Sequence, residues 1–381
     1  MIRVVTLFLL LISATVSAAP INLGVVLDQN EPITHSNTDA RYRSLAAEVE
    51  KALGEPVRIQ YFTRAFAAIK QARDGSLDIV FGPAHVIANI TKYKYEPILK
   101  TDEVIALAFV ASPNYTGSLS AKSAARLGLP DYESLIGGMA RSEINSRGLA
   151  KADFARIRFH NVPGVPLYGL KIGSYDLAVA TSDEAKAWVA SNGGRIVLNG
   201  APVPLRAMSV NSATISVALQ QKLVNDLKKN NGLKLTMNAA SGADFKGIAT
   251  MLNTTPNALP GATTIKAAEA KTMIEKGIKV FDVRVGEEYD VSHVPGAIHL
   301  PYGESSAKEV DFDPAEDKFS LNQLPADKNQ ALIMYCDGTI CWKSYKSALM
   351  AIRAGWKNVY WFRGGLPEWK EAGLPVEARK K

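Results

Sequence analysis

The residues of this 381-residue chain with the clearest chemical potential are its only two cysteines, Cys336 and Cys341, which lie five positions apart. A cysteine thiolate is a strong nucleophile, and two thiols that are close in sequence can form a disulfide when the segment between them curls. These residue types indicate sulfur transfer or dithiol–disulfide exchange. Two cysteines with no nearby histidine fall short of a zinc ligand set, and the sulfur chemistry needs no organic cofactor, so the sequence predicts neither.

The segments around the cysteines are expected to place Cys336 in a loop that stabilises anions. The apolar run 331–335 predicts a buried strand, and Ala348, Leu349 and Ile352 follow with the spacing of one helix face. Cys336 is therefore expected at the end of a strand, in a short loop that opens a helix. Backbone N–H groups and the helix dipole at such a loop lower the pKa of a thiol and bind anions.

The N-terminus has the pattern of a secretory signal peptide, which we expect to span residues 1–18. Arg3 supplies a positive start, residues 4–12 are apolar, and the segment 16–18 fits the site that a signal peptidase cuts. The mature protein is therefore expected in the periplasm, an oxidising compartment in which the two cysteines can pair.

The charge of the chain bears on its partners. The formal net charge of +7 is spread along the chain without a dense basic block, so a nucleic-acid partner is not predicted. A mildly basic surface favours small anionic ligands.

Residues 19–250 alternate between strand and helix patterns, which predicts a mostly parallel sheet with helices on both faces. The expected strands are residues 21–26, 57–61 and 77–81, and the expected helices are residues 42–53 and 63–74, with Thr63 as the N-cap of the second helix. Sheets of this kind bind ligands at the carboxyl ends of their strands. This places Gly82, Pro83 and His85 at a candidate site. We interpret His85 as a structural hydrogen-bonding residue rather than a metal ligand, because no Cys, Asp or Glu lies at ligand spacing from it.

This part of the chain resembles the periplasmic solute-binding proteins of the phosphate, phosphite and phosphonate type. The resemblance covers about residues 21–250, and it is carried by residues 75–84 (GSLDIVFGPA) and 175–180 (YDLAVA) and by Tyr61 with Thr63 ahead of a helix. It implies a two-lobed periplasmic-binding-protein fold of type 2, with crossing strands between the lobes and a small anion between them. It also implies ABC transporter membrane subunits as partners.

The same resemblance extends the set of candidate ligand-binding residues. It adds Tyr61, Thr63 and Ser142 to Gly82, Pro83 and His85. Ser142 lies in the segment 137–146, which corresponds to a family turn that binds an oxyanion at a helix N-terminus. Packing and capping remain an alternative role for Tyr61, Thr63 and His85.

A second domain is expected over residues 265–381, after a linker at residues 251–264 that is rich in turn-forming residues and has no apolar period. This domain resembles the rhodanese (sulfurtransferase) fold, an α/β domain with a central parallel sheet. Three runs carry the resemblance: residues 281–301, the Cys336 loop and residues 359–369. The resemblance implies that Cys336 carries a persulfide.

Further residues match positions of the rhodanese family. The active-loop residues that the resemblance implies are Asp337, Gly338, Thr339, Ile340 and Trp342. Three more, Asp282, Arg284 and Arg363, are interpreted as supporting residues that hold loops in place through hydrogen bonds, with the glycines after Arg363 shaping a turn beside the active loop.

The cysteine loop departs from the common family pattern at two positions. That pattern has glycine three positions and arginine five positions after the cysteine, where this chain has Thr339 and Cys341. Lys343 is then the candidate to bind an anionic donor, as a point charge without a bidentate fork. Two interpretations of Cys341 stay open: a resolving thiol that closes a disulfide onto Cys336, or a small buried residue behind the loop.

Two functions from different classes follow. The first is an exported sulfurtransferase in which Cys336 accepts sulfane sulfur from a thiosulfate-like donor and passes it to cyanide, a thiol or a sulfur-acceptor protein. The second is a non-catalytic periplasmic solute-binding protein whose rhodanese-like part is a disulfide-closed redox or docking module that a thiol reductant opens. A thiol–disulfide oxidoreductase is a third option, which the cysteine spacing disfavours because it is not Cys-x-x-Cys.

Overall fold

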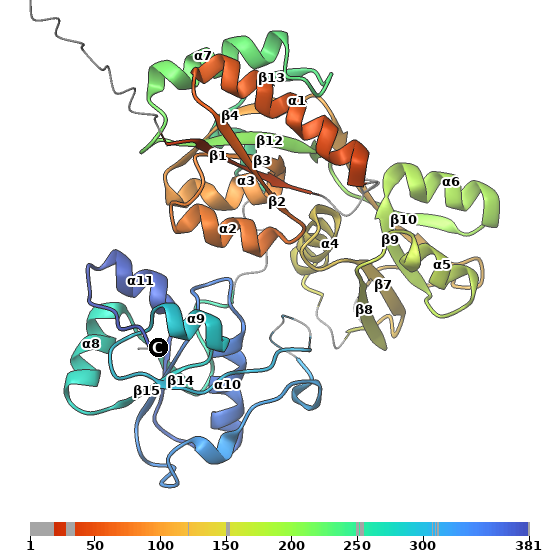
Figure 1. Ribbon diagram of the computed structural model, residues 1–381. Helices are drawn as coiled ribbons and strands as arrows, with labels where there is room; N and C mark the ends of the chain where they lie inside the picture. Colours follow the sequence, from red (N-terminus) through yellow and green to blue (C-terminus); the bar gives the residue numbers. More distant parts are fainter. Residues whose placement is uncertain are drawn as a thin grey trace, which may run out of the picture. The chain divides into compact units, whose positions relative to one another are not determined.

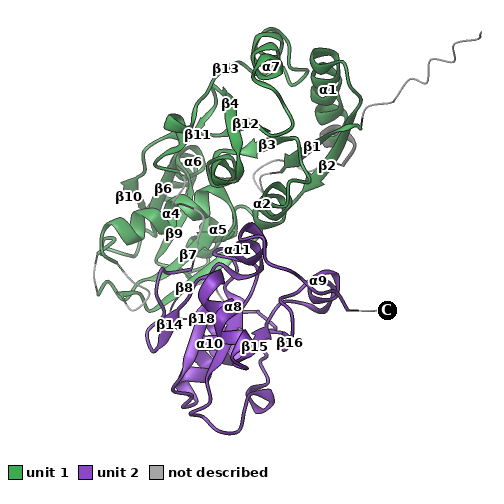
Figure 2. Cartoon of the chain, turned by 90° about the vertical axis from the view of Figure 1, so that its left-hand side faces the viewer, with its two compact units in different colours: residues 1–249 green, residues 250–381 purple. Residues whose placement is uncertain are grey.

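The computed structural model describes residues 19–27, 35–120, 122–149, 153–248, 251, 255–306, 308, 310 and 312–379. The expected signal peptide, residues 1–18, lies outside the described residues. The chain divides into two compact units, Met1–Ala249 and Thr250–Lys381 (Figure 2).

The first lobe of unit 1 is built on a six-stranded sheet. In sheet order, its strands are β13 (Met237–Ala239), β4 (Tyr95–Thr101), β12 (Arg206–Asn211), β3 (Ile79–Pro83), β1 (Ile21–Val26) and β2 (Val57–Phe62). Its helices are α1 (His35–Leu53), α2 (Ala65–Arg73), α3 (Ala84–Ile90) and α7 (Val217–Lys229). Figure 1 shows α1 and α7 on one face of the sheet and α2 and α3 on the other. The core under α1 and α7 contains Leu45, Val49, Leu223 and Leu227.

This sheet is mixed rather than mostly parallel. β1 pairs with β2 and β3 in parallel, as expected. β12, however, runs antiparallel to both β3 and β4, and β13 runs antiparallel to β4. The reason is the route of the chain, which leaves for a second lobe after β4 and re-enters the same sheet from the opposite end.

The second lobe contains a five-stranded sheet. In sheet order, its strands are β10 (Arg195–Asn199), β6 (Leu107–Ala111), β9 (Leu177–Thr181), β7 (Arg126–Pro130) and β8 (Arg156–His160). Its helices are α4 (Leu135–Ser146), α5 (Val165–Lys171) and α6 (Ser182–Asn192). Two short strands, β5 (Val104–Ile105) and β11 (Val203–Pro204), pair antiparallel where the chain passes between the lobes. The expected pair of α/β lobes with crossing strands is confirmed.

Unit 2 is a five-stranded sheet in which every strand pair is parallel. In sheet order, its strands are β14 (Ala262–Thr264), β18 (Val359–Phe362), β17 (Leu332–Tyr335), β15 (Lys279–Asp282) and β16 (Ile298–His299). Its helices are α8 (Ala267–Glu275), α9 (Gly286–Val291), α10 (Lys343–Arg353) and α11 (Gly365–Glu371). The parallel α/β domain expected here is confirmed.

Alternation along β17 explains why helices cover both faces of this sheet. Leu332 and Met334 face a core that includes residues of α10, while Ile333 and Tyr335 face a second core that includes residues of α8 and α11. Successive side chains of a strand point to opposite faces, so a continuously apolar strand requires cover on both.

Several boundaries differ from the sequence-based expectations. α1 begins at His35, earlier than residue 42, and β3 runs over Ile79–Pro83 instead of residues 77–81. Thr63 is not an N-cap, because α2 begins at Ala65 and Arg64 occupies the cap position without a capping side-chain bond.

The expected linker also differs, because residues 255–264 belong to unit 2. Leu259 lies in its core and β14 lies in its sheet. The turn-forming residues of this segment do not predict a strand, yet β14 forms there because it pairs with β18, about a hundred residues later in the chain.

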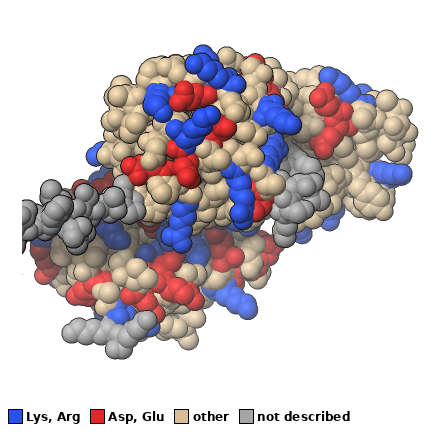
Figure 3. Space-filling model, turned by 45° about the horizontal axis from the view of Figure 1, so that its top comes forward, with Lys and Arg blue, Asp and Glu red and all other residues tan. Residues whose placement is uncertain are grey.

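Figure 3 shows basic and acidic side chains interspersed over the face that it draws. In the part of the chain that the structure describes, no helix is long and apolar enough to cross a membrane.

Candidate functional site

The two cysteines lie where the sequence places them, between a buried strand and a helix. β17 ends at Tyr335, Cys336 follows directly, and α10 begins at Lys343. On α10, Ala348 is fully buried, and Leu349 and Ile352 pack partly buried against the same core, so the expected apolar face is present. This face fixes the direction in which the helix leaves the cysteine loop.

Cys336 and Cys341 are joined by a disulfide, with their Cα atoms 6.2 Å apart. Of the two interpretations of Cys341, the structure therefore selects the one in which it closes onto Cys336. Cys336 is only 1% exposed, whereas Cys341 is partly exposed. A disulfide sulfur is not a nucleophile, so sulfur transfer at Cys336 requires prior reduction.

The backbone of the loop offers N–H groups to an anion. Gly338 has φ +88°, a conformation that glycine adopts without strain, and its carbonyl accepts a hydrogen bond from the Cys341 N–H at 3.0 Å. Among the described residues, no acceptor receives the N–H groups of Gly338, Thr339 and Ile340. Successive unpaired N–H groups of this kind form a concavity that stabilises anions.

The loop is held from outside by backbone contacts. The carbonyl of Cys336 accepts a hydrogen bond from the Leu366 N–H at 3.0 Å. Gly365, with φ +56°, lies so close that a Cβ there would stand 2.1 Å from the Cys336 carbonyl oxygen. The expected turn of glycines beside the active loop is present, and only glycine fits at this position.

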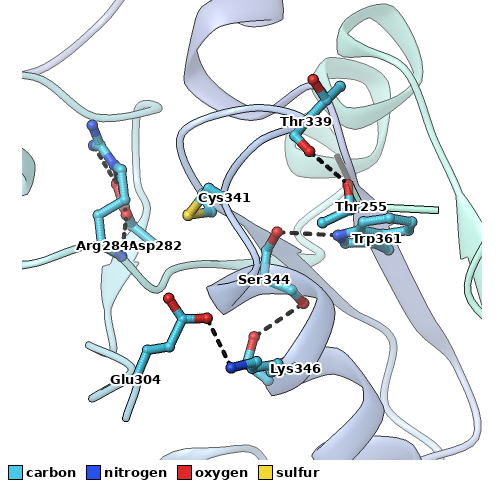
Figure 4. Close-up of a disulfide and its surroundings, with 11 residues drawn as sticks. Thr255, Asp282, Arg284, Glu304, Thr339, Cys341, Ser344, Lys346 and Trp361 are labelled. Atoms are coloured by element: carbon cyan, nitrogen blue, oxygen red, sulfur yellow. Dashed lines mark hydrogen bonds and ion pairs between the residues drawn. A yellow bond between two sulfur atoms is a disulfide. The ribbon is translucent and has the colours of Figure 1, made fainter. Parts of the chain in front are cut away.

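A second brace comes from the expected linker. The Thr339 carbonyl accepts hydrogen bonds from the Thr255 N–H at 2.8 Å and the Thr255 hydroxyl at 3.0 Å (Figure 4). Arg363 in turn donates to the Thr255 carbonyl at 2.6 Å. Arg363 therefore acts on the loop through Thr255, a residue that the sequence did not identify because it lies about eighty positions away.

Aromatic packing completes the frame of the loop. Trp342 is buried and stacks edge-on against Tyr345, which packs in the same way against Trp361. The Trp361 indole donates a hydrogen bond to the Ser344 hydroxyl at 3.1 Å (Figure 4), and Ile340 is also buried. These contacts fix the start of α10.

Asp282 and Arg284 form a buried ion pair at the end of β15, with an N–O distance of 2.6 Å. Tyr335 donates to the Asp282 carboxylate at 2.5 Å, and Arg284 donates to the Ser292 carbonyl at 2.7 Å. Burial disfavours the charged guanidinium, but the hydrogen bond to Asp282 and the negative charge of Asp282 together outweigh burial and raise the pKa of Arg284. These contacts tie two loops to the strand that precedes Cys336.

A buried cation also lies behind the loop. Lys346 of α10 is 0% exposed and pairs with Glu304 at 2.9 Å and, more distantly, with Asp317 at 3.7 Å. It also donates to the Ser306 hydroxyl at 2.8 Å. Burial acts to raise the pKa of Asp317, but hydrogen bonds from the Ser306 hydroxyl and neighbouring groups hold it below its ordinary value. The polar segment after β16 thus serves to satisfy one buried lysine.

The basic side chains near the loop differ in their partners. Arg284 and Lys346 form ion pairs and Arg363 donates to the Thr255 carbonyl, whereas Lys343 has no ion pair or side-chain hydrogen bond among the described residues. Lys343 is partly exposed at the first position of α10.

In unit 1, the candidate residues of the first lobe lie at the carboxyl ends of β2 and β3. Tyr61 is 38% exposed and donates to Asp39 at 2.9 Å, and burial raises its pKa to about 12. Thr63 is exposed in the turn before α2. Gly82 and Pro83 are buried, and a Cβ on Gly82 would stand 2.7 Å from the Cβ of Val26. Gly82 therefore serves close strand packing.

His85 is 1% exposed and its Nε2–H donates to the Glu133 carbonyl of the second lobe at 2.8 Å. Its Nδ1 atom has no hydrogen-bond partner in the described part of the chain. Burial lowers the pKa of His85 to about 4. His85 thus makes a buried hydrogen bond to the second lobe, and its role in ligand binding stays a prediction.

Glu133 is the residue of this region that the sequence did not reveal. Its nearly buried carboxylate forms an ion pair with Arg64 and accepts a hydrogen bond from the Phe66 N–H, at the start of α2, at 3.3 Å. The hydrogen bond to Glu133 raises the pKa of Arg64. A carboxylate of one lobe thus occupies an anion-binding helix start of the other lobe.

The helix N-terminus of this part of the second lobe lies at the start of α4, before the segment 137–146 in which it was expected. Ser134 is the N-cap of α4, and its hydroxyl accepts a hydrogen bond from the Gly137 N–H at 3.0 Å. Ser142 lies two turns further along α4, so it is not at a helix N-terminus. The signal for the true start was a serine immediately before an apolar helical run.

The second lobe also contains a small cavity of about 20 Å³, room for about one water molecule. Its lining includes Ser134, which follows β7, and His160 and Thr181, which are the last residues of β8 and β9. The Nε2 atom of His160 is 2.6 Å from the Tyr175 hydroxyl, and burial lowers the pKa of His160. In the part of the chain that the structure describes, this cavity included, no group of three or more His, Cys, Asp or Glu side chains could hold a metal ion.

Comparison with known families accounts for both units. Residues 32–248, more than half of the chain, match the family described as ABC transporter, phosphonate, periplasmic substrate-binding protein. The chain belongs to this family. Residues 266–372 match the rhodanese-like domain.

The curated relatives include sulfurtransferases. An HTH-type transcriptional regulator of Mycobacterium tuberculosis is 32% identical over 114 residues, which are 30% of this chain and 44% of that protein, so the chain spans less than half of its length. Thiosulfate sulfurtransferase 16, chloroplastic, of Arabidopsis thaliana is 27% identical over 118 residues, 30% of this chain and 93% of that protein. Thiosulfate sulfurtransferase GlpE of Actinobacillus pleuropneumoniae is 28% identical over 116 residues, with the same two shares.

Solved structures similar to this chain include two phosphonate-binding proteins. PhnD1 from Prochlorococcus marinus, in complex with methylphosphonate, has a TM-score of 0.47 and 15% identity, over 61% of this chain and 96% of that chain. A binding protein component of an ABC phosphonate transporter from Pseudomonas aeruginosa has a TM-score of 0.44 and 13% identity, over 61% and 85%.

Proposed function

We propose that unit 2 is a sulfurtransferase in which Cys336 accepts sulfane sulfur. The observation that carries the proposal is the position of Cys336 at the end of β17, in a loop whose N–H groups of Gly338, Thr339 and Ile340 have no acceptor among the described residues. Such N–H groups stabilise both the attacking thiolate and the persulfide anion. The sulfurtransferases among the relatives add support.

The reaction begins with reduction of the Cys336–Cys341 disulfide by a thiol reductant. The Cys336 thiolate then attacks the outer sulfur of a thiosulfate-like donor, the sulfur–sulfur bond of the donor breaks, and sulfite leaves. Lys343 attracts the anionic donor to the loop. A thiol, cyanide or a sulfur-acceptor protein finally takes the sulfur from the persulfide. No metal or organic cofactor enters these steps.

Unit 1 is proposed to bind a small anion or sulfur compound and to deliver it to ABC transporter membrane subunits. Membership of the phosphonate-type family supports this assignment. It also supports export to the periplasm, with residues 1–18 as the signal peptide. The guanidinium of Arg64 and the start of α2 supply the positive potential that an anion requires.

The test is the intact mass of the reduced protein before and after incubation with thiosulfate. We expect a gain of sulfur in the wild type and sulfite in solution, and neither in Cys336→Ser. Ser292→Ala, which removes a hydroxyl that accepts a hydrogen bond from Lys370 and keeps the carbonyl that accepts from Arg284, is the matched control and keeps the wild-type result.

A second candidate function is a non-catalytic binding protein with a locked disulfide. It is favoured by the burial of Cys336 and by the absence of arginine from the loop. It predicts a mass two hydrogens below that of the reduced chain and no sulfite production, even after treatment with a strong dithiol reductant.

A further inference from the structure

The sulfurs of Cys336 and Cys341 are placed for reaction with one another by contacts that do not involve them. Three backbone hydrogen bonds hold the loop: Leu366 N–H to the Cys336 carbonyl, Cys341 N–H to the Gly338 carbonyl, and Thr255 N–H to the Thr339 carbonyl. None of these bonds depends on the disulfide. After reduction, the loop keeps its anchors, and the two thiols stay opposed.

We propose that Cys341 is a resolving thiol that cleaves the Cys336 persulfide and releases hydrosulfide. This inference rests on the proposed function, because a persulfide must first form on Cys336. It extends that function from sulfur transfer to the reduction of sulfane sulfur, with the disulfide as the end state of each turnover.

The reaction balances in three steps. First, the Cys336 thiolate takes the outer sulfur of thiosulfate and sulfite leaves. Second, Cys341 attacks the inner sulfur of the persulfide, the Cys336–Cys341 bond forms, and the outer sulfur leaves as hydrosulfide with the proton of the Cys341 thiol. Third, a dithiol reductant supplies two electrons by exchange with the disulfide, which regenerates the Cys336 and Cys341 thiols, and the reductant becomes a disulfide itself. The net change is thiosulfate plus dithiol to sulfite, hydrosulfide, a proton and oxidised dithiol.

The structure favours attack on the inner sulfur. The two cysteine sulfurs are within bonding distance in the disulfide, so the inner sulfur of a persulfide on Cys336 lies on the path of Cys341. Hydrosulfide is a weaker base than an alkyl thiolate, and the weaker base leaves more readily in this exchange. The product of the step is the disulfide that the structure contains.

Burial makes the internal reaction faster than transfer to an external acceptor. Cys336 is 1% exposed, so an acceptor from solution must reach a covered sulfur. Cys341 is already in place, and well-oriented intramolecular reactions have effective molarities of about 10⁵ M or more. Partly exposed Cys341 is also the sulfur that an incoming reductant meets first, which returns the thiolate to Cys336.

A single-turnover experiment on the full-length exported protein tests the proposal. The protein is reduced with a dithiol, freed of reductant and given one equivalent of thiosulfate, so that no external thiol can release the sulfur. Sulfite and sulfide are quantified, and the intact mass is measured. We expect one sulfite and one sulfide per chain and a final mass two hydrogens below the reduced protein.

In Cys341→Ser, we expect one sulfite, a drop of sulfide by at least tenfold, and one sulfur atom retained on Cys336. If the serine variant does not fold, Cys341→Ala is measured in the same way, with the same expected amounts of sulfite, sulfide and retained sulfur. Wild-type protein that releases sulfite but retains its sulfur overturns the proposal and leaves the sulfurtransferase function intact. A retained sulfur that peptide mapping places on Cys341 overturns it as well, because the outer sulfur has then been attacked. Absence of sulfite in all variants overturns the proposed function itself.

Discussion

The cysteine loop of unit 2 and the lobe contacts around Glu133 in unit 1 both present backbone N–H groups to an anion, but they are assembled differently. In the loop, the two cysteines and the N–H groups between them come from one short segment, and Arg284, Arg363 and Lys346 are held by partners of their own. Around Glu133, the groups come from three distant segments, and the anion is a carboxylate of the protein itself.

Because the two regions are assembled differently, we expect substitutions in them to have different effects. The loop is buttressed by buried ion pairs whose loss destabilises the domain. The Glu133 contacts join two lobes across groups that a ligand anion can also use. Four measurements test this contrast between a loop held by buried pairs and a lobe contact that competes with a ligand.

The largest effect is expected for Lys346→Met, which removes the cation that Glu304 and Asp317 surround. Uncompensated buried charges cost about 3–5 kcal/mol, so the free energy of unfolding of unit 2 should fall by that amount. Denaturant unfolding followed by tryptophan fluorescence is the measurement, because Trp342, Trp356, Trp361 and Trp369 lie in unit 2 and only Trp188 lies in unit 1.

Lys343→Met is the matched control for this prediction. It changes a partly exposed lysine of the same helix that has no ion pair among the described residues, so stability should change by at most about 0.5 kcal/mol. Equal losses in the two variants would contradict a buttressing role for Lys346.

In unit 1, acidification should destabilise the fold through His85. Its pKa is about 4 in the folded chain and 6.5 ordinarily, because burial disfavours the charged ring. Between these two pH values, the unfolded chain binds a proton that the folded chain does not, so lowering the pH through this window lowers the free energy of unfolding. The full loss is about 3 kcal/mol.

His85→Gln removes the titrating group while keeping a donor for the Glu133 carbonyl. Unfolding of unit 1 by denaturant, followed by circular dichroism at pH 7 and pH 4, should show a smaller acid loss in this variant than in the wild type. The same loss in both proteins would exclude His85 as its source.

Glu133→Gln should raise the affinity of unit 1 for a small anion. The variant frees the Arg64 guanidinium and the start of α2 from a competing carboxylate, and we expect about tenfold tighter binding of a small phosphonate used as a probe of the family, equivalent to about 1.4 kcal/mol. Isothermal titration calorimetry at constant ionic strength measures it.

Glu143→Gln, at a residue of α4 that pairs with Arg147 at 3.6 Å, should leave the affinity unchanged. Weaker binding in Glu133→Gln would instead show that Glu133 organises the site and does not compete for it.

The smallest effect is expected for Thr255→Val. The variant loses the hydroxyl bond to the Thr339 carbonyl at 3.0 Å and the bond that the hydroxyl accepts from Arg363 Nε at 3.2 Å, but it keeps the N–H bond at 2.8 Å. Unit 2 should therefore lose about 1 kcal/mol of stability. Thr263→Val, at an exposed position of β14, serves as the comparison. An unchanged unfolding midpoint in Thr255→Val would show that the hydroxyl bond does not hold the loop.

Much of the fold could be predicted from local patterns. The apolar strand before Cys336, the helix after it and the alternation of strands and helices in both units are periodic features of neighbouring residues. What could not be predicted depends on chain crossings. The antiparallel return of β12, the strand hidden in residues 262–264 and the start of α2 at Ala65 all require knowledge of partners far away in the chain.

The same division holds for the sites. The sequence by itself determined that Cys336 lies in a loop between a strand and a helix with the second cysteine close to it, because a strand, a short loop and a helix bring consecutive residues together whatever the rest of the chain does. Only the tertiary structure decided that Thr255 braces the loop, that Lys346 is neutralised beneath it, and that Glu133 occupies the start of α2. Those contacts join segments that are tens of residues apart, and their geometry is set by packing, which local sequence patterns do not encode.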